Sequence, residues 1–274
     1  MLYLYCKISK NNIYILHFME KKIPPIIHYC WLSDEEKPEK IQKCIDSWHA
    51  MMPDYEIMCW DMNRFDINSV PFVKTACEAR KWAFAADYIR LYALYHYGGI
   101  YLDSDVFVYK SFDPFLVHSA FTGSQVNTAI FEAQIREGSN DCVGIEAAVI
   151  GAMPKHKWIK DLLSFYDGKT FENTPECRRK FVMTKVVADI CAEKYNFKFM
   201  PLYQVLDEDV HVYPPDTFSI PTDERCVAKY STHWCANSWV EHQDNHKYTL
   251  KEKVKIFIVH KLIGVNNWRK LTKS

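Results

Sequence analysis

The chain has 274 residues, of which 49% are hydrophobic and 25% are charged, and its 34 basic and 34 acidic side chains give a formal net charge of zero. This composition is ordinary for a globular protein that buries a sizeable core. Because the charges balance, no overall field favours a polyanion, and we expect no nucleic-acid partner.

Residues 1–22 are interpreted as an extension ahead of the folded domain. Their apolar runs are broken by Lys7, Lys10 and Asn11, and they fall short of the roughly 20 apolar residues that a spanning helix needs. They also lack the pattern of a signal peptide. The ten cysteines have irregular spacings and form no C-x-x-C pair, so we predict reduced thiols and a cytoplasmic protein.

Predicted strands and helices alternate from residue 26 onward. The apolar run 26–31 predicts a buried strand, 37–51 an amphipathic helix, and 55–60 a second strand. The stretch 72–97 predicts one long helix, which the following two glycines end. The later predicted elements are strands at 100–102, 106–112 and 146–153 and helices at 156–166 and near 181–190. This alternation predicts an α/β fold with a largely parallel sheet.

Asp103 and Asp105 directly follow the predicted strand 100–102. Ligands of open α/β sheets bind at the carboxyl ends of strands, and residues two apart in an extended segment share a face. Two close carboxylates repel each other unless one is protonated or a cation lies between them. Their oxygen atoms suit Mg²⁺ or Mn²⁺, which would also neutralise a departing diphosphate. The alternative is a turn with two solvated acids.

Asp87 and Arg90 are the only charged residues between Lys81 and Asp103. Three residues apart on a helix, they are neighbours. They either form a plain ion pair within the helix or bind substrate, with Asp87 on a sugar hydroxyl and Arg90 on a sugar or phosphate oxygen.

Four stretches together resemble glycosyltransferase family 32 over residues 23–240. They are "IPPIIHYCWL", "SWHAMMPDYEIMCWD", "FAADYIRLYALYHYGGIYLDSDVFV" and "HWCANSW". The resemblance implies a GT-A fold, a Rossmann-like nucleotide-sugar-binding α/β fold with a mixed, mostly parallel central sheet and extra helices, over residues 23–245. The site is also similar to that of the large clostridial glucosylating toxins.

The resemblance implies roles for the acidic pair and the helix pair. Asp105 would bind the metal directly, and Asp103 would contact the ribose and the water shell of the metal. Asp87 and Arg90, in "DYIR", would hold the donor sugar.

The same resemblance extends to residues at both ends of the domain. Trp31 would stack on the nucleobase, and Ser238 and Trp239 would approach the diphosphate. His233 would be a metal ligand, with an ordinary core histidine as the alternative. Glu146 stands where the family often has an asparagine facing the sugar, and is either a sugar contact or a surface acid.

The activity that follows from the resemblance is metal-dependent transfer of a hexose or N-acetylhexosamine with retention. The donor would be a nucleotide-diphosphate sugar, and Mn²⁺ or Mg²⁺ the divalent cation. The acceptor would be an oligosaccharide or a lipid-linked glycan, in surface or capsular polysaccharide synthesis. The acceptor hydroxyl would attack from the face that the diphosphate leaves, and no general base is assigned.

The C-terminal segment 246–274 carries seven lysines and Arg269 against a single acid, Glu252. Its apolar residues fall at helical spacing, which predicts a basic amphipathic helix that contacts the inner face of a membrane peripherally. The alternative is a helix packed on the domain with solvated lysines.

Two other functions are compatible with parts of the sequence. The stretch "IYLDSDVFV" superficially resembles the acidic loop of haloacid dehalogenase-like phosphatases, although Phe107 stands where that loop needs threonine or valine. A non-catalytic, membrane-docked binding module is the other alternative. Such a module predicts that neither activity nor binding depends on Asp105.

Overall fold

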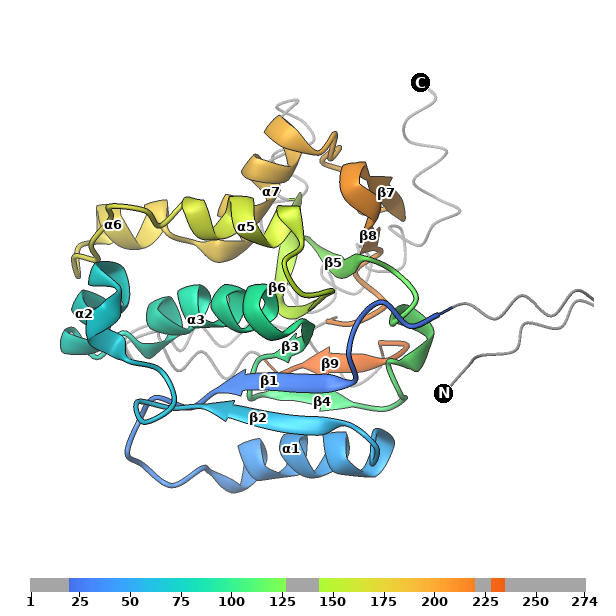
Figure 1. The fold of residues 1–274 in the computed structure, drawn as a ribbon, viewed down its shortest axis with the longest axis horizontal. Helices are drawn as coiled ribbons and strands as arrows, with labels where there is room; N and C mark the ends of the chain where they lie inside the picture. Colours follow the sequence, from blue (N-terminus) through green and yellow to red (C-terminus); the bar gives the residue numbers. More distant parts are fainter. Residues whose placement is uncertain (1–19, 127–142, 220–227, 235–274) are drawn as a thin grey trace, which may run out of the picture.

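A computed structural model describes residues 20–126, 143–219 and 228–234 of the chain (Figure 1). The predictions for residues 1–19, for Ser238 and Trp239, and for the segment 246–274 lie outside the described residues. Within the described part, no helix combines the length and hydrophobicity that crossing a membrane requires.

A seven-stranded sheet in the order β2-β1-β3-β6-β5-β8-β7 forms the centre of the fold. Its strands are β1 (Ile26–Cys30), β2 (Glu56–Trp60), β3 (Gly99–Leu102), β5 (Ala120–Val126), β6 (Val143–Ala152), β7 (Gln204–Leu206) and β8 (Val210–Tyr213). The pairs β1–β2, β1–β3 and β5–β8 are parallel, whereas β6 is antiparallel to both neighbours and β7 to β8. Five of the seven strands therefore share one direction, and the predicted α/β class with a mixed, mostly parallel sheet is confirmed.

Helices cover both faces of this sheet (Figure 1). They are α1 (Glu39–Met51), α2 (Pro71–Glu78), α3 (Trp82–Tyr97), α5 (Lys157–Ser164), α6 (Pro175–Lys180) and α7 (Met183–Lys194), with short 3₁₀ turns at Ile67–Ser69, Asp113–Phe115 and Asp207–Asp209. One hydrophobic core joins the sheet to α2, α3, α5 and α7, and a second joins it to α1.

The single helix predicted for 72–97 is wrong, because the chain breaks it between α2 and α3. Arg80 has a φ of 54°, and the amides of Arg80 and Lys81 donate to the carbonyls of Cys77 and Ala76 at 2.9 Å each. These bonds form a Schellman motif, which usually has glycine at the left-handed position. Because arginine occupies this position, a search of the sequence for glycine or proline does not find this helix end.

A second, two-stranded sheet connects distant parts of the chain. In it, β4 (Val106–Val108) runs antiparallel to β9 (Ser231–His233), with Val106 opposite His233. Helix α1 supports β4 from below, since Trp48 Nε1 donates to the Val106 carbonyl at 2.8 Å. The short sheet thus places His233 beside the turn that carries Asp103 and Asp105.

His28 is fully buried in β1, and its side chain contacts β2 and the residue that precedes β3. Its Nδ1 accepts from Trp60 Nε1 at 3.1 Å and its Nε2 lies 2.7 Å from the Gly98 carbonyl. Because the indole can only donate and the carbonyl can only accept, this is a neutral imidazole with its hydrogen on Nε2. Gly99, at φ 105°, passes so close to β1 that an added Cβ would lie 2.6 Å from the Ile26 carbonyl oxygen.

We predict that this histidine makes the protein less stable in acid. Burial, opposed only in part by the Gly98 carbonyl, lowers the pKa of His28 from 6.5 to about 4. The unfolded chain then binds the proton more readily, so this stability is present above pH 6.5 and is lost as the pH falls toward 4. The difference corresponds to about 3 kcal/mol. Urea unfolding between pH 7 and pH 4 should show this loss in the free energy of unfolding of the wild type. His28→Gln should remove that part of the dependence of the free energy on pH. Equal slopes would contradict the assignment.

Candidate active site

Asp103, Asp105 and His233 form a cluster at the carboxyl end of β3. Each offers a ligand atom, and these atoms all lie within 4.8 Å of one another. His233 Nε2 lies 3.2 Å from Asp105 Oδ1 and 3.9 Å from Asp103 Oδ2. The two acids converge as predicted, although a turn and not an extended segment brings them together, and the structure brings His233 to them as well.

Backbone hydrogen bonds fix the turn between the two acids. The amide of Asp103 donates to the Ala148 carbonyl of β6 at 2.9 Å, and the amide of Val106 donates to the Asp103 carbonyl at 3.0 Å. On the other side, the amide of Trp234 donates to the Asp105 carbonyl at 3.0 Å. The carboxylates are therefore held by a rigid strand end rather than by a free loop.

This donor set suits a divalent cation. Two carboxylates and one imidazole offer hard oxygen ligands with a borderline nitrogen, as Mn²⁺ accepts, and Mg²⁺ also binds through one or two carboxylates. Three protein ligands leave further coordination positions for water or phosphate oxygens. Asp103, Asp105 and His233 would hold the ion.

Arg90 lies directly behind the acidic pair and is 4% exposed. Its Nη2 lies 2.8 Å from Asp87 Oδ1 and 3.3 Å from Asp103 Oδ1, and its Nη1 donates to the Ala147 carbonyl at 2.5 Å. The Tyr101 ring lies beneath the guanidinium, 4.5 Å from centroid to Cζ. The predicted ion pair of Asp87 with Arg90 is thus present, and it extends to Asp103.

Burial sets the electrostatics of this network. It raises the pKa of Asp87 to about 7, against the opposing effect of Arg90. It also raises the pKa of Asp103, while Arg90 and His233 pull in the other direction. Burial alone would lower the pKa of Arg90, but Asp103, Tyr101 and Asp87 outweigh it and raise that pKa. The guanidinium therefore stays charged, and it favours the ionised forms of both acids against the effect of burial.

Glu146 is buried in β6, so the alternative of a surface acid is wrong. Its Oε1 accepts from the amides of Ala147 at 3.0 Å and Ala148 at 2.8 Å. The same oxygen lies 3.9 Å from His233 Nδ1, on the side of the ring away from the two aspartates. The carboxylate therefore lies on the Nδ1 side of the imidazole, at an ion-pair distance rather than a hydrogen-bond distance.

Trp31 follows β1, at the same edge of the sheet as the acidic pair, because β1 and β3 are parallel. Its Nε1 donates to the Glu35 carbonyl at 2.9 Å, and the Lys37 ammonium lies 5.5 Å from the ring centroid. Its stacking on a nucleobase stays a prediction.

Residues 38–122 match the family model described as "Glycosyltransferase sugar-binding region containing DXD motif". The matched segment contains Asp87, Arg90, Asp103 and Asp105, and His233 lies beyond it. This segment is thus similar to the sugar-binding region of the DXD-containing glycosyltransferases. The resemblance to glycosyltransferase family 32 is confirmed by this match, and with the mixed sheet described above so is the expected GT-A fold.

Two yeast proteins are among the similar sequences. "Inositol phosphoceramide mannosyltransferase 3" of Schizosaccharomyces pombe is 39% identical over 106 residues, which are 36% of this chain and 29% of the relative. "Mannosyl phosphorylinositol ceramide synthase SUR1" of Saccharomyces cerevisiae is 30% identical over 141 residues, 49% of this chain and 32% of the relative. The chain thus spans about a third of the length of these relatives.

Among solved structures, "PaToxG Glycosyltransferase" is similar to this chain with a TM-score of 0.45 and 16% identity. The superposed part covers 63% of this chain and 70% of that one.

Proposed function

We propose that the protein is a metal-dependent glycosyltransferase. It moves a hexosyl unit from a nucleotide-diphosphate sugar to a hydroxyl of an oligosaccharide or a lipid-linked glycan, with retention. The observation that carries the proposal is the convergence of Asp103, Asp105 and His233 at the end of β3. The buried Arg90 behind this cluster supports it.

The residues of the chain act mainly by positioning and electrostatics. A divalent ion held by the cluster would neutralise the charge that builds up on the departing diphosphate. Arg90 fixes Asp103 and keeps the carboxylate of Asp87 in place for a sugar hydroxyl. Trp31, at the same edge, is the residue that we propose for stacking on the nucleobase. No residue is assigned as a general base.

The names of the two yeast relatives make mannose the first donor sugar to test, and they make an inositol-phosphate lipid the first acceptor. A surface or capsular polysaccharide is the second acceptor class. We place the reaction on the cytoplasmic side of a membrane. A phosphatase is less well supported, because Phe107 continues into β4 and faces Thr232 of β9, so that its position is that of a sheet residue.

A thermal-shift measurement tests the proposal. We expect one of UDP, GDP and CMP, or a sugar conjugate of one of them, to stabilise the protein with Mn²⁺ or Mg²⁺ but not with EDTA. A ligand at about 100 times its dissociation constant adds about 2.7 kcal/mol, which raises the midpoint by roughly 5–10 °C in a domain of this size. Stabilisation by no nucleotide, in folded protein, would contradict a donor site. Phosphatase activity without any nucleotide would favour the rival enzyme.

A further inference from the structure

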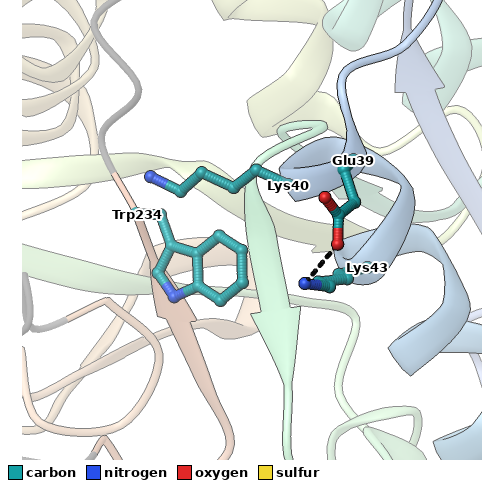
Figure 2. A pocket seen from close by; sticks show the side chains of 4 residues that line it. All are labelled: Glu39, Lys40, Lys43 and Trp234. Atoms are coloured by element: carbon teal, nitrogen blue, oxygen red, sulfur yellow. Dashed lines mark ion pairs between the residues drawn. The ribbon is translucent and has the colours of Figure 1, made fainter.

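An open surface cavity of about 430 Å³ lies between the start of α1 and the residue that follows β9, and the lining residues of α1 are exposed. Glu39, Lys40, Lys43 and Trp234 line it (Figure 2). Its volume lies within the usual range for small-molecule sites. None of the site predictions from the sequence includes any of these four residues.

Trp234 forms an aromatic wall of this cavity. Its ring stacks on Phe107 of β4, with centroids 5.4 Å apart and planes 18° from parallel. The stack and the hydrogen bond from its amide to Asp105 hold the indole in place. A fixed aromatic face is a surface on which the apolar C–H face of a sugar ring can lie.

The other walls carry a net positive charge. Lys43 pairs with Glu39 at 2.7 Å, one turn apart on α1 (Figure 2). Lys40 forms no ion pair within the described residues, and its ammonium lies over the Trp234 ring, 5.1 Å from the centroid. Two ammonium groups and one carboxylate therefore leave one positive charge, which an anionic group can neutralise by a charge-assisted hydrogen bond.

The position of the cavity favours binding of the acceptor rather than of the donor. Trp234 directly follows His233, and neighbouring Cα atoms lie about 3.8 Å apart. Successive side chains of an extended segment point to opposite sides. The imidazole faces the acidic pair that would hold the donor diphosphate, whereas the indole faces the cavity. A group bound there lies beside the reaction centre without competing for the metal.

We infer that this cavity binds a phosphate-bearing sugar or polyol ring of the acceptor, with the ring on Trp234 and the phosphate on Lys40. This inference rests on the proposed transferase function, because it assigns the ligand to the acceptor. The phosphate can belong to a soluble sugar phosphate or to a lipid head group. A ligand from either source would make the same contacts with Trp234 and Lys40.

The test measures binding to the full chain in EDTA, so that the metal-dependent donor site takes no part. By calorimetry, glucose 6-phosphate should bind more tightly than glucose or inorganic phosphate. Lys40→Gln should weaken it about tenfold or more, which is the effect of losing one charge-assisted contact. Trp234→Ala should also weaken it. Lys160→Gln, an exposed lysine of α5, is the matched control and should change nothing.

A second arm identifies the source of the phosphate. Vesicles of phosphatidylcholine with phosphatidylinositol are compared with vesicles that contain phosphatidylserine, which has no polyol ring. Lys40-dependent binding to the inositol lipid supports the inference with a lipid source, and binding of the soluble probe alone supports it with a soluble source. Binding of neither, or equal binding by wild type and Lys40→Gln, overturns the inference.

Different results would refute the transferase function and the sugar-phosphate cavity. Asp105→Asn removes a metal ligand and should leave the binding of glucose 6-phosphate in EDTA intact. A protein that binds the sugar phosphate but no nucleotide would retain the cavity as a binding site and refute the transferase.

Discussion

Replacing Arg90 by methionine should lower the free energy of unfolding by about 3–5 kcal/mol, the usual cost of removing one partner from a buried ion pair. The reason is that Asp87 and Asp103 both face this guanidinium, at 2.8 and 3.3 Å. Methionine fills much of the same volume but leaves both carboxylates without a cation. Urea unfolding at pH 7 measures the loss directly.

Lysine at this position should recover only part of that stability. The guanidinium reaches three acceptors at once, namely two carboxylates and the Ala147 carbonyl. An ammonium on a flexible stem cannot hold the same planar arrangement. We therefore expect Arg90→Lys to lie between the wild type and Arg90→Met, with full stability in Arg90→Lys as the contradicting result.

A double substitution separates the ion pair from mere packing. Asp87→Asn removes the buried one of the two carboxylates that face Arg90, so it should cost less in the Arg90→Met background than in the wild type. Residues in one buried network show coupling energies of about 0.5–3 kcal/mol. Additive losses would mean that Arg90 acts through its volume alone.

The part of the site that the sequence predicts is the part defined by local spacing. Asp103 and Asp105 are two residues apart after a strand, and Asp87 and Arg90 are three apart on a helix. Local geometry alone brings each pair together, so their patterns suffice. The family resemblance adds His233, whose approach depends on the pairing of β4 with β9. No periodicity in either short segment indicates that pairing.

The remaining features depend on contacts between distant segments. Arg90 reaches Asp103 because α3 packs against β3, and Glu146 is buried because β6 lies between β3 and β5. The turn that ends α2 has Arg80 at the left-handed position where glycine is usual. The start of α1 meets Trp234 only in the folded chain. These features set the electrostatics of the site, and only the three-dimensional structure shows them.

Replacing Asp105 by asparagine should abolish metal binding at the site and lower sugar transfer by at least about a hundredfold. Asparagine keeps the size of the side chain but loses the charge that balances the cation. A metal ion contributes several kcal/mol to stabilising a departing diphosphate, and each 1.4 kcal/mol is a factor of ten in rate. Titration of free Mn²⁺ by electron paramagnetic resonance measures binding, and product formation from a labelled nucleotide sugar measures transfer.

The fold should survive this change, because the turn is held by backbone bonds of Asp103, Val106 and Trp234 rather than by the Asp105 side chain. The matched control is Asp189→Asn, an exposed carboxylate of α7 that pairs with Lys185, and it should leave both readouts unchanged. Asp105→Asn protein that binds Mn²⁺ as tightly as wild type would refute the assigned metal site. If transfer were still lost in that case, Asp105 would act on the substrate itself, and the ion would have to be held elsewhere.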